Sequence, residues 1–465
     1  MRKTTLACAG SLAALAAVCA APAYADTTDD ILKSLRDKGI LSEQEYQALA
    51  KRKADEEATR IATLPASGSA SSPAAAIDPK TVRMMDSGVG VELGPVQVKL
   101  SGSINGFYVH DSGDAPAANR VVAGGLATVG NNDTSSIRNG LLPGFIKVDV
   151  TTNQGGWDVG AHFGLYPGIN SVTGVGGANS AGSPTALSTA GIDARQTYLT
   201  VGRPNFGELK IGRDIGLFGS DAILDDMTLL GVGTAAGNAA PSNTSLGRIG
   251  IGYIYTDFQP QITYTTPSWQ GLQASVGVFE PLVTAGGTEV NSSPGFQAKL
   301  ALDHKFSGLS THLWFDYISQ QHKSVVGMPT YTGDGFDLGG KLAWGPAGLV
   351  GYYYSGSGLG TTGLFILSTD AAGQKRDSDG YYIQGTYTIS KLTLGASYGE
   401  SHLSLASGEV LPTLLDTNSS AVGQVRYALT TWLSLVGEYT HTRSTAHNGN
   451  EASSDALAAG GILFF

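Results

Sequence analysis

Few residues of this 465-residue chain have the types and spacing of a catalytic or metal site. His312 and Asp316 lie on one face of a segment with strand alternation, so they could serve as a base and its orienting partner for a serine nucleophile. No serine motif stands out, because Gly219-Ser220-Asp221 lacks the strand-turn-helix setting of a nucleophile elbow. His441 and His447 do not have metal-ligand spacing. We therefore expect no enzyme, no metal site and no cofactor.

The unusual charged residues lie in one long stretch, DIGLFGSDAILDDMTLLGVGTAAGNAAPSNTSLGR, from Asp214 to Arg248. Its centre, ILDDMTLL at 223–230, is apolar and acidic together, and Asp221 lies just before it. Loops normally run over the surface and carry polar residues, so this mixture is odd for a loop in free solvent.

The elements around this stretch read as β-strands from Val96 to Phe465, because apolar and polar residues alternate with a period of two. We expect seven short turns, near 153–156, 204–207, 267–271, 306–309, 345–348, 390–391 and 430–431, and eight long connections, near 111–139, 168–192, 214–248, 281–294, 322–334, 357–379, 402–419 and 444–455. Fifteen connections predict 16 strands, with both ends on the short-turn side. The span 248–266 contains Pro260 and could be one strand or a hairpin, which leaves the count open by two.

Composition points to a membrane protein built from strands. Glycine accounts for 64 of 465 residues and charged residues for only 15%, against roughly 7% and about 25% in soluble proteins. After the N-terminal leader no run of about 18 apolar residues exists, so only a closed barrel could satisfy its backbone within a bilayer. Positions that alternation turns inward, such as Lys299, Asp316, Asp337 and Lys341, are charged, which suits a water-filled lumen.

Charge and cysteine usage narrow the partners. The formal charge is −10, and removal of Arg2 and Lys3 with the leader leaves −12, which argues against a nucleic-acid partner. Both cysteines, Cys8 and Cys19, lie within the leader, so we expect a mature chain without disulfides.

Both chain ends carry targeting patterns. Residues 1–25 have a basic start, an apolar core and the small-x-small sequence Ala23-Tyr24-Ala25, which predicts a signal peptide. The C-terminus, ALAAGGILFF, alternates apolar residues and ends on an aromatic one. It resembles the assembly signal of bacterial outer-membrane β-barrels, with Leu463 and Phe465 at the last positions of that pattern.

The mature N-terminus is expected to form a separate unit. Ser42 with Glu45 is a capping box that starts a second short helix, so 26–60 predicts a helical hairpin. This segment resembles the hairpins found before the barrel in some proteobacterial porins, which implies a periplasmic coiled coil that helps to bundle three protomers. Residues 61–95 read as a linker that leads into the barrel of 96–465.

The sequence RQTYLTVGRPNFGELKIGRD at 195–214 resembles the strand-turn-strand before the constriction loop of general porins, and the chain as a whole looks like a Gram-negative trimeric porin. The resemblance implies an all-β transmembrane antiparallel barrel of about 16 strands. It further implies that the loop enters the barrel and presents Asp221, Asp225 and Asp226 to the pore. A basic wall would face them, made of Arg138, Lys147, Arg195, Arg203 and Arg213. The alternative is a loop that stays outside with solvated aspartates.

We therefore expect a homotrimer in the outer membrane of a Gram-negative bacterium that passes small hydrophilic solutes and ions by diffusion. Its partners would be outer-membrane lipid, lipopolysaccharide and the barrel-assembly machinery. Acidic loops predict a weak preference for cations, and a channel for small organic anions held by Arg195 and Arg213 is the alternative. An adhesin would need a large segment before the barrel, and a gated transporter would need a plug domain.

Overall fold

The computed structural model describes residues 82–85, 88–169, 192–235, 244–284, 289–323 and 329–465. The predicted signal peptide, the helical segment 26–60 and most of the linker lie outside these residues. Among the described residues, no helix is both long and apolar enough to cross a membrane.

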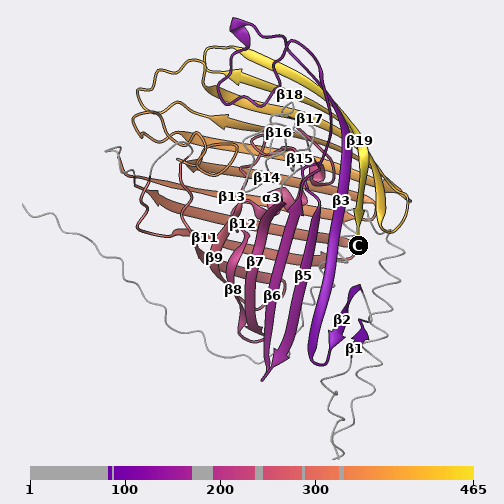
Figure 1. Cartoon of the computed structure of the whole chain (residues 1–465). Helices are drawn as coiled ribbons and strands as arrows, with labels where there is room; N and C mark the ends of the chain where they lie inside the picture. The colour runs from indigo at the N-terminus through magenta and orange to yellow at the C-terminus, as the bar shows by residue number, and fades with distance from the viewer. Residues whose placement is uncertain (1–81, 86–87, 170–191, 236–243, 285–288, 324–328) are drawn as a thin grey trace, which may run out of the picture.

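Sixteen of the described strands close into one antiparallel barrel, as predicted (Figure 1). In ring order they are β3 (Val96–Gly113), β5 (Phe145–Gln154), β6 (Trp157–Pro167), β7 (Ile192–Arg203), β8 (Gly207–Ile215), β9 (Phe258–Thr265), β10 (Leu272–Phe279), β11 (Gly295–Phe306), β12 (Leu309–His322), β13 (Tyr331–Trp344), β14 (Ala347–Ser357), β15 (Asp377–Ile389), β16 (Leu392–Leu403), β17 (Leu415–Ala428), β18 (Leu433–Ala446) and β19 (Glu451–Phe464). The ring closes because β3 pairs with β5 along one edge and with β19 along the other.

The connections confirm the predicted asymmetry, with one exception. All seven short turns lie where expected, between β5 and β6, β7 and β8, β9 and β10, and the four later hairpins. Residues 258–265 form one strand, β9, with Pro260 paired opposite Arg213, so the open count settles at 16. The predicted long connection at 444–455 is wrong. There β18 reaches Ala446 and β19 begins at Glu451, because polar residues continue the ladder beyond the apolar alternation.

Side chains divide by strand parity into an apolar outer face and a polar inner one. On β15, for example, Ile383 is 52% exposed, whereas the adjacent Gln384 is 6% exposed. Trp269, Trp344 and Trp432 are exposed beside short turns and Trp157 also borders one, which is the position of an interfacial aromatic girdle.

Three shorter strands complete the sheet: β1 (Val82–Met84), β2 (Val89–Leu93) and β4 (Thr134–Arg138). β2 pairs with the part of β3 that extends past the end of β19. At this seam Phe465 and Gly102 exchange two backbone hydrogen bonds of 3.0 Å. A Cβ atom at Gly102 would lie 2.3 Å from the Phe465 ring, so a larger residue at this position would displace the terminal phenyl group.

Candidate functional site

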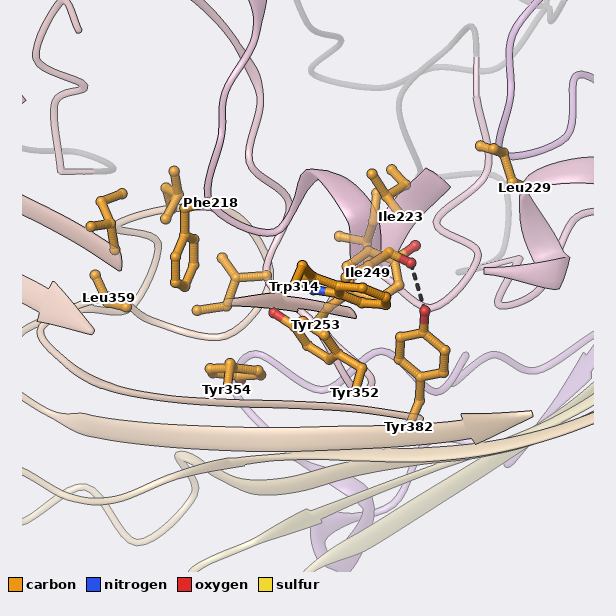
Figure 2. Close-up of a cluster of buried hydrophobic side chains, with 14 of the residues drawn as sticks. Phe218, Ile223, Leu229, Ile249, Tyr253, Trp314, Tyr352, Tyr354, Leu359 and Tyr382 are labelled. Carbon is orange, nitrogen blue, oxygen red and sulfur yellow. Dashed lines mark hydrogen bonds between the residues drawn. The ribbon is translucent and has the colours of Figure 1, made fainter. Parts of the chain in front are cut away.

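The segment between β8 and β9 lies inside the barrel and packs on its wall. It contains a short helix, α3 (Ser220–Asp225), and a 3-10 turn, η2 (Met227–Leu230). Its apolar side chains join buried aromatic residues of the wall in one cluster, which includes Phe218, Ile223, Leu229, Ile249, Tyr253, Trp314, Tyr352 and Tyr382 (Figure 2). The apolar residues that looked out of place in a loop are therefore covered by inward-facing wall residues.

Hydrogen bonds attach the backbone of this segment to polar side chains of the wall. Gly219 N donates to Asp337 Oδ2 on β13 (2.8 Å), and Met227 N donates to Gln384 Oε1 on β15 (2.9 Å). Tyr382 OH donates to the carbonyl of Ala222 (2.8 Å) (Figure 2). Buried backbone groups need such partners when water is excluded. The segment is thus fixed on the wall at several points.

Two of the three predicted loop aspartates form ion pairs with the wall beneath them. Asp221 pairs with Lys299 of β11 and lies 3.7 Å from His312 of β12. Burial alone would raise the pKa of Asp221, but the Lys299 ammonium and the His312 imidazole lower it below its usual range. Asp225 pairs with Lys341 of β13 at 3.0 Å. Both negative charges are therefore compensated locally.

Asp226 differs from the other two, because it is only 2% exposed. Its carboxylate accepts hydrogen bonds from the backbone N–H of Thr228 (2.9 Å) and from Tyr253 OH (3.0 Å). Burial raises the pKa of Asp226, and the nearby Arg248 guanidinium opposes that shift. Asp226 stabilises the turn after α3 and does not face the lumen.

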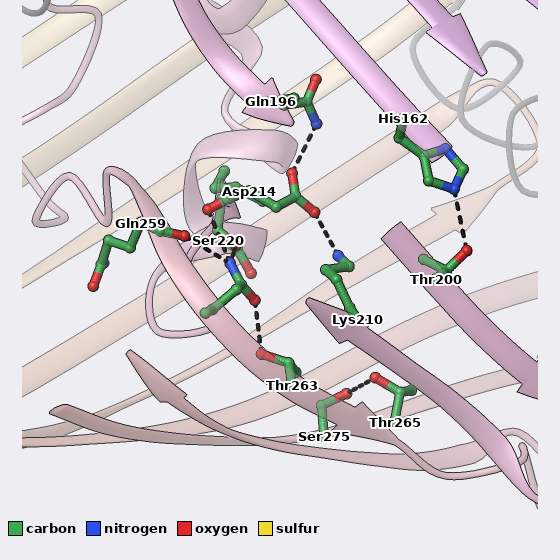
Figure 3. A network of polar contacts seen from close by, with 12 residues as sticks. His162, Gln196, Thr200, Lys210, Asp214, Ser220, Gln259, Thr263, Thr265 and Ser275 are labelled. Carbon is green, nitrogen blue, oxygen red and sulfur yellow. Dashed lines mark hydrogen bonds and ion pairs between the residues drawn. The ribbon is translucent and has the colours of Figure 1, made fainter. Parts of the chain in front are cut away.

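The wall from β5 to β8, called the uncovered wall because α3 does not cover it, also carries charges. Lys147 on β5 lies on the inner face, two residues before Asp149, which contacts His162 Nδ1 at 2.6 Å. Lys210 and Asp214, both on β8, form an ion pair (Figure 3). This wall presents alternating positive and negative groups to the lumen, so it can contact polar solutes of either sign.

Arg138 and Arg195 also lie within the barrel, but they have structural partners. Arg138 on β4 is fully buried and donates from Nη2 to the carbonyl of Thr244 (2.6 Å), so it holds the segment in place. Arg195 occupies a register shift of β7, where an extra residue changes the alternation. It pairs with Asp193 at 3.1 Å and lies 5.2 Å from the centre of the Tyr166 ring.

The structure does not bring the last two predicted basic residues to this site. Arg203 lies at the short-turn end of β7, with its guanidinium 3.7 Å from the centre of the Trp157 ring. Arg213 shares the outer face of β8 with the exposed Ile211 and bonds to the carbonyl of Phe258. Two-residue parity already places Arg213 opposite to Lys210 and Asp214, so the sequence contained this signal.

The groups considered for catalysis have other partners. His312 contacts Asp303 at 3.0 Å and Asp221 at 3.7 Å, and Asp316 pairs across the strands with Asp337. The Ser220 hydroxyl donates to the carbonyl of Leu217 (2.8 Å) and accepts from Lys299 Nζ (2.9 Å). Within the described ranges, no group of three His, Cys, Asp or Glu residues could hold a metal ion.

Comparison with known proteins adds a family match and several similar structures. Residues 61–447 match the Gram-negative porin family. The outer membrane channel DcaP of Acinetobacter baumannii has a TM-score of 0.60 at 15% identity, over 80% of this chain and 99% of that one. An anion-selective porin from Comamonas acidovorans scores 0.53 at 14% identity, over 80% and 100%. OmpF of Salmonella typhi scores 0.52 at 11%, over 81% and 100%. Among curated proteins, none matches this sequence.

Proposed function

Because this chain belongs to the Gram-negative porin family, we propose that the segment between β8 and β9 forms the constriction of its channel. The protein is an outer-membrane channel for passive diffusion of small hydrophilic solutes and ions. The observation that carries the proposal is the attachment of α3 to the barrel wall, where Asp221 and Asp225 pair with Lys299 and Lys341. A segment fixed there narrows a lumen that a 16-stranded barrel would otherwise leave wide.

The charge arrangement favours a weak preference for cations. Asp221 and Asp225 are each compensated by a lysine on their own side, so the field across the pore is smaller than unpaired aspartates would produce. The long loops remain acidic, which attracts cations at low salt. Preference for small organic anions is the second candidate, and Lys147 on the uncovered wall favours it. That candidate loses one of its two expected arginines, because Arg213 faces outward.

The assembly proposals rest on the family and on the C-terminal seam. A homotrimer, with residues 26–60 as a periplasmic coiled coil, is expected to bury part of the apolar outer face. Outer-membrane lipid and lipopolysaccharide would cover the rest.

The barrel-assembly machinery would recognise Leu463 and Phe465, and deletion of Phe465 should impair assembly. Normal yields of folded trimer without Phe465 would refute the signal.

Single-channel recording in a planar bilayer, with the reversal potential measured across a KCl gradient, tests the proposed function. Conductance steps in threes with slight cation preference support a trimeric, weakly selective pore. Strong anion preference, or block by low concentrations of an organic anion such as benzoate, would favour the second candidate. Absence of conductance in folded trimers would contradict both and return attention to an enzyme, which the hydrogen-bonded state of Ser220 does not favour.

A further inference from the structure

Two aspartates that the ion pathway does not require face each other beneath α3. Asp316 on β12 and Asp337 on β13 are direct cross-strand partners, and both are 0% exposed. Side chains in this relation have Cβ atoms roughly 5 Å apart. Asp337 Oδ2 also accepts the hydrogen bond from Gly219 N, 2.8 Å long, at the start of α3. The carboxyl pair therefore belongs to the part of the wall to which α3 is attached.

Two buried carboxyl groups that face each other across neighbouring strands cannot both be ionised at neutral pH, because like charges so close repel strongly and burial penalises each charge. The hydrogen bond from Gly219 favours the charged form of Asp337. Asp316 is then the protonated member, and its hydroxyl can donate to Asp337.

The surroundings set what a second negative charge would do. The titratable or charged groups facing the pair are Lys299 on β11, Tyr352 and Tyr354 on β14, and Asp221 on α3. His312 on β12 and Lys341 on β13 lie four residues further along the same strands. Lys299 is the cross-strand partner of Asp316 and the ion-pair partner of Asp221. An ionised Asp316 would compete with Asp221 for this ammonium and repel Asp221 itself.

We propose that Asp316 and Asp337 share one proton and together position α3, so that loss of this proton to solvent at alkaline pH changes ion permeation. The inference rests on the proposed constriction by α3. The added charge lies beneath α3, the helix that carries Asp221 and Asp225 at the proposed constriction, so the potassium-to-chloride permeability ratio should rise with pH. We expect a rise of about twofold, the size that one unit charge at roughly 8 Å in water produces in this ratio when about 0.15 M salt screens it.

The test compares the permeability ratio at pH 9.5 and pH 6.5 within each protein, using folded trimers in planar bilayers. Wild type should show the twofold rise. Asp316→Asn keeps a hydrogen-bond donor to Asp337 but removes the shared proton, so its ratio should stay flat. Asp337→Asn, which leaves one carboxyl group, provides a second variant with the same expected result. Asp158→Asn, on the inner face of β6 far from α3, is the matched control and should rise as wild type does.

A flat wild-type profile, or a rise retained in Asp316→Asn and Asp337→Asn, would overturn the inference. Failure of the constriction proposal has a different signature, because Asp225→Asn would then leave selectivity at neutral pH unchanged. The two proposals can therefore fail separately.

Discussion

Two parts of the barrel wall, β11 to β18 and β5 to β8, share one architecture but have different interiors. From β11 to β18, inward side chains lie under the segment that carries α3, and even large ones such as Tyr354 and Tyr382 are almost fully buried. From β5 to β8, inward groups such as Lys147 and Lys210 form a wall that α3 does not cover. Charges on the covered wall pair with residues of the segment, as Lys299 does with Asp221, whereas those on the uncovered wall pair with neighbouring wall residues, as Lys210 does with Asp214.

The role of an inward-facing residue therefore depends on whether the segment that carries α3 covers it. Lys299 and Lys147 are both inward lysines, yet one holds a buried aspartate and the other borders the pathway. Substitutions made in pairs, one on each wall, test whether the two walls differ in this way.

The largest effect is expected for Phe218→Ala, because Phe218 is fully buried in the cluster between the segment and the wall. Loss of this ring should lower the free energy of unfolding by about 3–5 kcal/mol. Urea titration of detergent-solubilised trimers measures it. Phe163→Ala on the outer face of β6, where the ring is 48% exposed, serves as the control and should cost less. Equal costs would mean that the segment does not pack as described.

Lys299→Met should destabilise more than Lys147→Met. The first leaves Asp221 partly buried without its cation, at a cost of about 3 kcal/mol. The second removes a lysine from the uncovered wall and should cost under about 1 kcal/mol. Urea titration gives both values, and the first variant should also show larger fluctuations of the open-channel current. A similar loss of unfolding free energy in the two variants would contradict the difference between the two walls.

Asp225→Asn should shift selectivity toward anions by about twofold, because Lys341 then contributes an uncompensated charge beside the pore. Asp226→Asn is the matched control on the adjacent residue. Asp226 is buried and bonded to Tyr253, so its substitution should cost stability with little change in selectivity. Reversal potentials across a KCl gradient measure both. A selectivity shift from Asp226→Asn alone would place that residue in the lumen.

The smallest effect concerns the long-loop rim, outside both walls. Glu409 Oε2 accepts a hydrogen bond from Arg376 Nε (2.9 Å), and this contact lowers the pKa of Glu409. A lowered pKa stabilises the fold above the unfolded value of about 4.3 and loses that contribution as pH falls through the folded value. Protease resistance of the loop at 404–414 should therefore fall below about pH 4. Glu409→Gln should show a flatter profile, and an unchanged profile would contradict the assignment.

Much of the fold could be predicted from the sequence because its causes are local. Two-residue alternation marks the strands, and short turns alternate with long connections. The exception at 444–455 arose because the neighbouring ends of β18 and β19 are rich in polar residues and therefore lack the apolar alternation by which a strand is recognised in a sequence. The mixture of apolar and acidic residues at 223–230 marked this segment as unusual. The resemblance of 195–214 to general porins implied that the segment packs on the barrel wall, and the structure places Ile223 and Leu229 there.

Local sequence patterns were enough to predict a closed barrel of about 16 strands with an apolar exterior and a polar interior, because hydrophobic period and turn spacing are properties of neighbouring residues. Which charged residues form ion pairs depends on the tertiary structure. Lys299 is 78 positions beyond Asp221, and their contact depends on the path of the segment across the lumen. A register shift in β7 also changed the orientation of Arg195. Pairing across a barrel follows from register and closure, which no local pattern specifies.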